Sequence, residues 1–113
     1  MINVMADNKS NTKAIIHLLI DEIAFFTLRI DELKAELEPV KERFIEAYKQ
    51  VKSWDKIYDK SWSEDAKEIY WNSFEPVEKI WHELDEQKME LEKQIDYFEE
   101  MKENREMILK ELK

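Results

Sequence analysis

The sequence of 113 residues contains no glycine and only two prolines. Sheets and tight turns depend on glycine for backbone conformations that other residues avoid, so this composition favours long helices with few connections. The absence of glycine also excludes the glycine-rich loops that bind phosphate groups. Cysteine is absent as well, which excludes disulfides, thiolate zinc sites and a cysteine nucleophile. The length is that of one domain.

Apolar runs that could cross a membrane are also missing. The run over residues 14–20 is stopped by Asp21 and Glu22, far short of the roughly 20 residues that a membrane span needs. Residues 1–11 are nearly neutral and lack the basic segment of a cleaved signal peptide. We therefore expect a cytoplasmic protein that does not bind a membrane.

Acidic side chains, in contrast, are abundant, and the net charge is −9. Residues 1–60 carry 11 acidic and 10 basic side chains, whereas residues 61–113 carry 16 acidic and 8 basic ones. Such an excess disfavours direct binding of nucleic acid or of an anionic surface. It favours a basic protein partner, for example a protein that itself binds nucleic acid.

Apolar residues recur at alternating steps of three and four from Ile16 to Tyr58. This spacing fills the a and d positions of a heptad repeat, which is typical of a long helix packed along another helix. Pro39 lies inside the pattern and predicts a kink, because proline removes one helical hydrogen bond. The first seam comprises Ile16, Leu19, Ile23, Phe26, Ile30, Leu33, Leu37, Val40, Phe44, Ala47, Val51, Trp54 and Tyr58.

The boundaries of the helices follow from capping and turn signals. Thr12 is a good N-cap residue, so we predict a first helix over about residues 12–59 after a flexible N-terminal arm of residues 1–11. A turn over about 59–62 then leads to a second helix over about 63–112. Ser61 stands at capping-box spacing from Glu64, and Ser63 precedes an acidic first turn.

Within the second helix, Pro76 predicts a break or kink near residues 73–76. Residues 63–72 would then form a short extra helix at the tip of the hairpin. Ala66, Tyr70 and Phe74 stand four apart and lead into a second seam. That seam is predicted to comprise Val77, Ile80, Leu84, Gln87, Leu91, Gln94, Phe98, Met101, Arg105, Ile108 and Leu112.

Folding the chain about residues 60–61 brings the two seams together. Ile30 then faces Leu91, and Phe26 faces Ile95, so that apolar residues meet along most of the length. The predicted fold is all-α: a long, kinked antiparallel helical hairpin that forms one coiled-coil-like domain over residues 12–113.

The sequence has more apolar residues than the a and d positions of two facing helices require. Ile20 and Tyr48 flank the first seam, and Trp81, Ile95 and Leu109 flank the second. A stripe this wide predicts a further partner, either a second copy that completes a four-helix bundle or another protein. The alternatives are a short third helix, or the drift of a 3.6-residue period across a single face.

Two sets of side chains are candidates for partner binding. Tryptophan is enriched in binding hot spots, but three of the four gather near the predicted turn and would equally form a small aromatic core there. Acidic residues also recur every seven positions and form a column on the second helix. This column would imitate a phosphate backbone, dock on a basic groove, or simply form a solvated face. The candidates are Trp54, Trp62, Trp71, Trp81, Glu78, Asp85, Glu92, Glu99 and Glu106.

The sequence shows no motif for catalysis or for metal binding. The only two histidines are His17 and His82, and the paired Glu-x-x-His arrangement of di-iron helical bundles is missing. The sequence holds no nucleophile beside an activating base and an orienting third group. We therefore expect no enzymatic activity, no metal and no cofactor.

The segment that begins at Trp62 resembles the turn and second-helix start of WXG100 (ESX-type) proteins. The likeness consists of Trp62 at the turn, followed by Ala66, Tyr70 and Phe74 at successive steps of four, with Glu64 where the family has glycine. The resemblance implies a dimer-forming helical hairpin that a type VII secretion system exports without a cleaved signal peptide.

The sequence thus leaves three hypotheses for function. The first is a small acidic helical adaptor or inhibitor of a protein target, of the kind that phages make. The second is a nucleic-acid mimic that blocks a host nucleic-acid-binding enzyme. The third is a secreted, WXG100-like hairpin.

Overall fold

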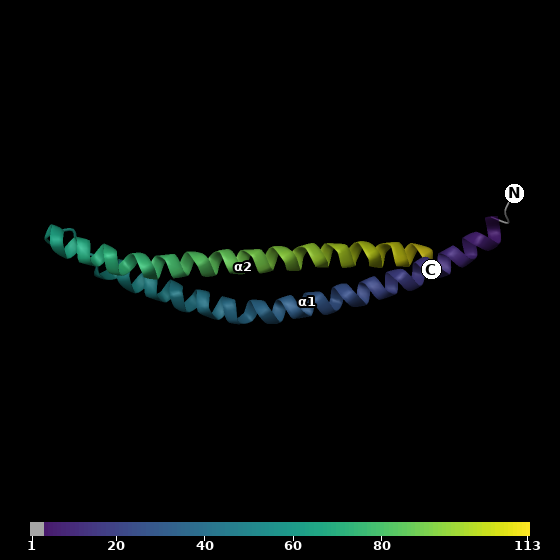
Figure 1. Cartoon of the computed structure of the whole chain (residues 1–113), viewed down its shortest axis with the longest axis horizontal. Helices are drawn as coiled ribbons and strands as arrows, with labels where there is room; N and C mark the ends of the chain where they lie inside the picture. Colours follow the sequence, from purple (N-terminus) through teal and green to yellow (C-terminus); the bar gives the residue numbers. More distant parts are fainter. Residues whose placement is uncertain (1–3) are drawn as a thin grey trace. The chain divides into compact units, whose positions relative to one another are not determined.

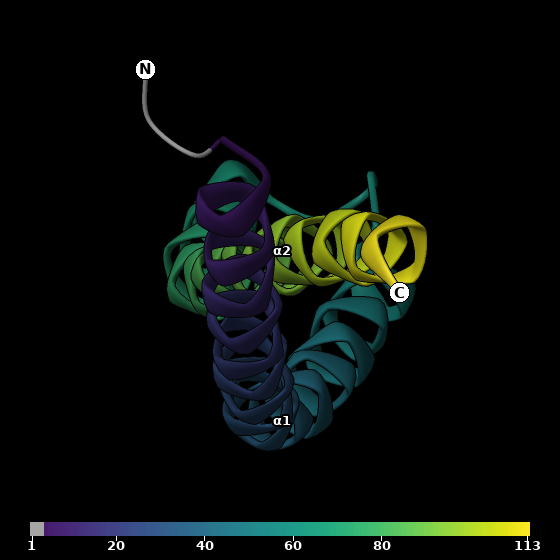
Figure 2. The same cartoon turned by 90° about the vertical axis from the view of Figure 1, so that its right-hand side faces the viewer.

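The computed structural model describes residues 4–113, with side chains described from residue 11 onward. It contains two helices, α1 over Val4–Ile57 and α2 over Glu64–Leu112 (Figure 1). The described residues include no strand, and Figure 2 shows α1 and α2 as coiled ribbons. The all-α prediction is therefore confirmed.

The N-terminus of α1 differs from the prediction. Residues 1–3 of the predicted arm lie outside the described residues, but α1 already begins at Val4 and not near Thr12. The polar residues before Thr12 cost only a few tenths of a kcal/mol each inside a helix, and neither glycine nor proline interrupts them. Good capping residues therefore do not by themselves start a helix.

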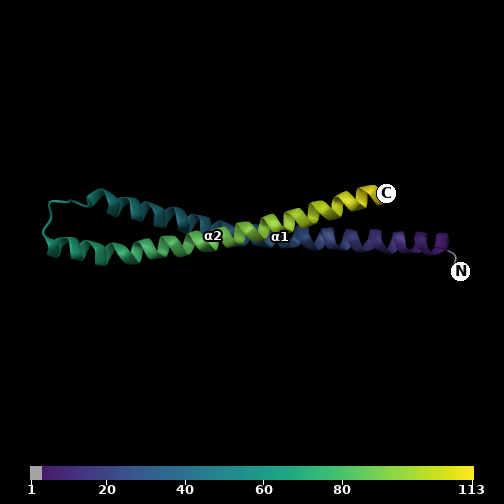
Figure 3. The same cartoon turned by 90° about the horizontal axis from the view of Figure 1, so that it is seen from above.

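Residues 58–63 connect α1 to α2 (Figure 3). Short polar contacts hold this connection. Asp59 Oδ1 accepts hydrogen bonds from the Ser61 backbone N–H at 2.9 Å and from Ser61 Oγ at 2.7 Å. These two bonds lower the pKa of the Asp59 carboxyl, the backbone bond contributing most. Ser63 Oγ accepts a hydrogen bond from the Ala66 N–H at 3.2 Å, which makes Ser63 the N-cap of α2.

Both prolines lie inside unbroken helices. α1 continues through Pro39, as the preserved heptad phase around it predicted. α2 continues through Pro76. Of the predicted break or kink near residues 73–76, the break is therefore wrong, as is the separate helix over 63–72. Tyr70 and Phe74 are buried on the N-terminal side of Pro76, and their packing outweighs the one hydrogen bond that the proline removes.

The chain packs as two compact units. One unit joins Met1–Lys34 to Lys93–Lys113, and the other is the continuous stretch Ala35–Glu92. Each unit is a pair of antiparallel helical segments. In the first unit, Glu22 pairs with Arg105 and Phe26 packs on Phe98, so residue numbers rise along α1 as they fall along α2.

The predicted seam of α1 is confirmed throughout. Each of its residues from Ile16 to Tyr58 is buried or half-buried. Leu33 is completely enclosed, and Leu19, Ile30, Leu37 and Val51 are nearly so. The heptad pattern therefore identified the packed face of α1 correctly.

The predicted seam of α2 is confirmed in part. Gln94, Met101 and Arg105 are half-buried as predicted, whereas Gln87 and Leu112 are exposed. Leu84, Leu91 and Phe98 are half-buried as predicted, but Ile80 is 54% exposed and Ile108 43% exposed. The neighbouring residues Trp81, Ile95 and Leu109, which were expected to flank the seam, are the ones packed inward. The bulkier tryptophan, isoleucine and leucine fill the space opposite α1 better than the glutamines at positions 87 and 94 would.

The pairing of the helices also differs from the prediction by about one helical turn. Phe26 packs on Phe98 in the first unit, where Ile95 was expected. In the second unit, Trp54 packs on Tyr70 rather than near residue 67. Tyr58, at the end of α1, also packs on Tyr70, with ring centroids 5.1 Å apart. The aromatic contacts at the closed end set this register, which a symmetric fold about residues 60–61 does not reproduce.

Candidate protein-binding surfaces

The closed end of the second unit contains an aromatic cluster. Its buried centre consists of Val51, Tyr70 and Phe74. The Tyr70 hydroxyl donates a hydrogen bond to the Trp54 carbonyl oxygen at 2.7 Å, and the Tyr70 ring stacks on Phe74 with centroids 5.8 Å apart. Burial raises the pKa of the Tyr70 hydroxyl above its ordinary value, with smaller contributions from Asp55 and Tyr58. This cluster joins the two helices.

The four predicted tryptophans serve different purposes. Trp54 and Trp62 are half-buried and pack on Tyr70, so they belong to the aromatic cluster. Trp71 contacts the same cluster but leaves 50% of its surface exposed. Trp81 lies further along, between Phe44 and Tyr48, and its buried Nε1 has no hydrogen-bond partner among the described residues. Only Trp71 of this set therefore offers a large exposed face.

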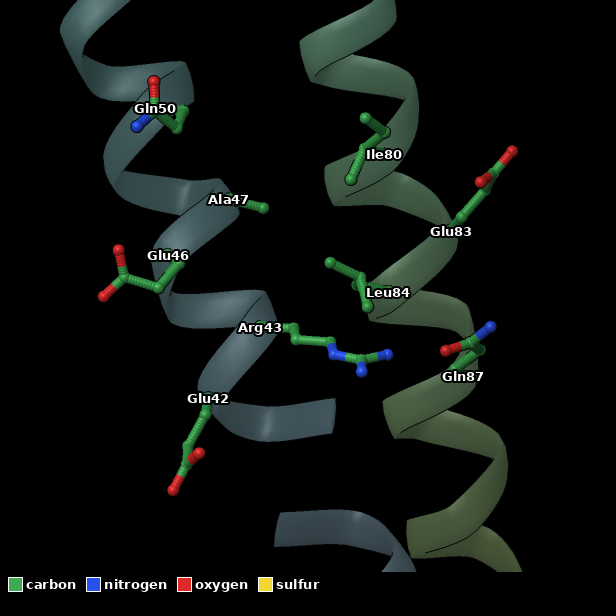
Figure 4. Close-up of a pocket in the computed structure, with 9 residues that line it drawn as sticks. All are labelled: Glu42, Arg43, Glu46, Ala47, Gln50, Ile80, Glu83, Leu84 and Gln87. Carbon is green, nitrogen blue, oxygen red and sulfur yellow. The ribbon is translucent and has the colours of Figure 1, made fainter. Parts of the chain in front are cut away.

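A groove of about 640 Å³ lies between α1 and α2 in the second unit (Figure 4). Ile80 and Leu84 point from α2 toward α1, and Ala47 faces them from α1. Arg43 extends from α1 toward α2 beside them. The other residues that line the groove are Glu42, Glu46, Gln50, Glu83 and Gln87. We call this hollow the interhelical groove.

The interhelical groove continues along the same pair of helices. An adjoining hollow of about 420 Å³ shares Gln87 with the first. Val40 and Leu91 line its apolar part, and Glu86 and Glu90 line its polar part. Sequence reasoning missed this surface because it assigned Ile80 to the packed seam.

The acidic column is divided by local pairing. In the second unit, Glu78 and Asp85 are half-buried, and the Glu92 carboxylate accepts a hydrogen bond from Lys88 Nζ at 2.9 Å. That bond is the main reason why the pKa of Lys88 is raised. In the first unit, Glu99 pairs with Lys34 at 3.3 Å and Glu106 with Lys102 at 4.0 Å. Lysines thus offset the charge of Glu92, Glu99 and Glu106.

An apolar stripe on α1 of the first unit was also missed. Leu18 and Phe25 are each 58% exposed, and Leu28 is 59% exposed. Leu18 and Phe25 stand seven residues apart and Leu28 follows three later, so the three fall near one face of α1. Sequence reasoning named Ile20 as the surplus residue here. The seven-residue step from Leu18 to Phe25 is the signal that would have revealed the stripe. We call these three residues the α1 stripe.

Neither histidine lies in a polar cluster. His17 and His82 are exposed, and the His82 ring packs beside Trp81 with centroids 4.9 Å apart. Within residues 11–113, no group of histidine and acidic side chains has the arrangement of a metal site. Over the part of the chain that the structure describes, no helix has the length and hydropathy needed to cross a membrane.

Comparison of the chain with protein-family models, with curated proteins and with solved structures finds no match.

Proposed function

We propose that this chain is a non-enzymatic protein-binding module, a small acidic helical adaptor or inhibitor of a protein target. The observation that carries the proposal is the α1 stripe. The seam of α1 is already occupied by α2, yet Leu18, Phe25 and Leu28 remain more than half exposed on another face. Groups of exposed large apolar side chains typically mark a protein contact.

The same stripe supports self-association. Two copies that packed their α1 helices through Leu18, Phe25 and Leu28 would form a four-helix bundle, an arrangement that buries a second stripe on each helix. The first 60 residues carry almost balanced charge, 11 acidic and 10 basic side chains, so electrostatic repulsion between two such faces is small. A homodimer is therefore part of the proposal, with a second copy and the protein target as alternative occupants of the stripe.

A nucleic-acid mimic is the second candidate, favoured by the excess of acidic residues in the C-terminal half. Its acidic column would have to displace lysines, because Glu92, Glu99 and Glu106 are paired with Lys88, Lys34 and Lys102. This cost makes the mimic the weaker candidate.

A secreted hairpin of the WXG100 kind is the third candidate. It is favoured by the position of Trp62 in the connection and by the burial of Tyr70 and Phe74 on α2. Its test is export: a chain without its C-terminal turns should remain inside cells that contain a type VII system.

The first experiment is a pull-down from host lysate at low and at high salt, with the molar mass of the bait measured by light scattering. An apolar contact retains its partner at high salt, whereas a nucleic-acid mimic loses it and competes with DNA or RNA. A bait with Phe25→Glu should lose the salt-resistant partner, and a bait with Ile57→Glu, an equally exposed isoleucine in the other unit, should retain it. A monomer that captures nothing at either salt concentration contradicts the proposal.

A further inference from the structure

The interhelical groove has a specific origin in the packing of the second unit. Phe44 stacks on Trp81 with centroids 6.1 Å apart, and Tyr48 packs on the same indole at 5.9 Å. These rings fill one edge of the interface between the helices. On the other edge the seam residue is Ala47, whose methyl group is too short to reach across. The groove therefore lies where a large seam residue is missing.

The groove combines an apolar floor with an acidic rim. Its floor consists of Val40, Ala47, Ile80, Leu84 and Leu91. Its rim carries the carboxylates of Glu42, Glu46, Glu83, Glu86 and Glu90, against the single guanidinium of Arg43. Apolar surface in such a setting suits a ligand with an apolar face and basic flanks.

We propose that this groove binds a basic amphipathic helix of a partner protein. The floor extends along α2 from Ile80 to Leu91, about 16 Å at the helical rise, which corresponds to about three turns of a bound helix. Such a helix would place aliphatic side chains at steps of three and four on Ile80 and Leu84, and lysine or arginine beside the glutamates. The inference rests on the proposed function, because it specifies a second surface of a protein-binding module, in addition to the α1 stripe, and the partner that this surface takes.

Charge distinguishes this occupant from the others. Nucleic acid is repelled by five carboxylates around the floor. A second copy of this chain has a net charge of −9, and its C-terminal half carries 16 acidic and 8 basic side chains. Lys49 pairs with Glu46 at 3.5 Å, but the rim as a whole is acidic. It therefore attracts a cationic helix, which raises the association rate and selects against acidic helices.

The test uses the full-length protein and a synthetic helical peptide of about four turns. The peptide carries leucines on one face and lysines on both flanks, with capped ends and a fluorescent label. Two control peptides have the lysines replaced by glutamates, or the leucines redistributed around the helix. Fluorescence anisotropy should show saturable binding of the first peptide alone, weakening as salt rises.

Matched variants locate the binding surface. Ile80→Gln should weaken binding about tenfold, because it removes an apolar contact from the floor. Ile45→Gln is the control, since Ile45 is 51% exposed on α1 and does not line the groove. The pair Glu83→Gln with Glu86→Gln should weaken binding at low salt and flatten its salt dependence. The pair Glu68→Gln with Glu111→Gln, which changes the net charge equally but elsewhere, should do neither.

Circular dichroism of each variant establishes that the helices are retained. The inference is overturned if the basic peptide does not bind saturably, if the glutamate peptide binds as well, or if Ile45→Gln weakens binding as much as Ile80→Gln. These outcomes differ from failure of the proposed function, which is a monomer that captures no protein from lysate. A partner that is captured but insensitive to Ile80→Gln leaves the protein-binding module intact and removes only the groove.

Discussion

A substitution at Ile30 would test which residues form the core of the first unit. It is 5% exposed within the α1 seam. Ile30→Asp places a carboxylate there without a partner, and we expect a loss of about 4 kcal/mol or more in the free energy of unfolding. Circular dichroism and a thermal melt measure it.

Met107→Asp is the matched control for that substitution, because Met107 belongs to the same unit, is 59% exposed and lies outside the α1 stripe. It should change the melting temperature little. If Ile30→Asp leaves both helicity and melting temperature unchanged, the packed face of α1 has been assigned incorrectly.

Tyr70 supports a prediction about alkaline pH. Because burial raises its pKa in the folded state, the unfolded chain releases this proton first, from pH of about 10. The stability that the neutral hydroxyl contributes is complete below that pH and is lost as pH rises through the folded-state pKa. Chemical unfolding between neutral and strongly alkaline pH should show this loss.

Tyr70→Phe separates that effect from other alkaline titrations. It removes the hydrogen bond to the Trp54 carbonyl and should cost about 1 kcal/mol near neutral pH. Its unfolding free energy should also fall less steeply above pH of about 10 than that of the unmodified protein. Parallel pH profiles of the two proteins would show that Tyr70 does not contribute to the pH dependence.

At the scale of the element, the start of α2 depends on its cap. Ser63→Ala removes the acceptor for the Ala66 N–H and should cost about 1 kcal/mol. Ser73→Ala is the matched change inside α2, where alanine is the better helix former, so it should be neutral or stabilising by a few tenths of a kcal/mol. Urea unfolding of both variants measures the difference. A clear loss on Ser73→Ala would indicate a second helix start before Pro76, contrary to the unbroken α2.

The two helices were not equally predictable from the sequence. In α1, both heptad positions are apolar from Ile16 to Tyr58, so a single face satisfies the pattern. In α2, the predicted seam contains the polar residues Gln87 and Gln94. Trp81 and Ile95 are each one residue after a predicted seam position. Either the predicted positions or the positions one residue later could face α1. The two choices have similar hydropathy and differ in how well their side chains fit against α1. The assignment of Ile80 to the seam failed for this reason, and the groove was missed with it.

At the scale of the whole molecule, the α1 stripe predicts the oligomeric state. Light scattering of the purified protein should give the mass of a dimer. Leu18→Glu with Phe25→Glu should give a monomer with unchanged helicity, because both side chains are exposed within one chain and two added charges oppose their burial. Ile45→Glu with Ile69→Glu, at exposed positions of the other unit, should leave the mass of a dimer. A monomeric unmodified protein would contradict self-association and leave the stripe to another protein.

The sequence by itself determined the helical class, the packed face of α1 and the capping signal at Ser63. These features depend on local propensity, on hydrophobic periodicity and on one side-chain contact within a turn, all of which lie within short stretches of chain. Only the tertiary structure decided the pairing of the helices and the phase of α2. Both depend on how side chains of two distant segments fit together, as Phe44 with Trp81 and Trp54 with Tyr70 do. The interhelical groove follows from that fit, because a small residue opens a hollow only where the opposite helix fails to fill it.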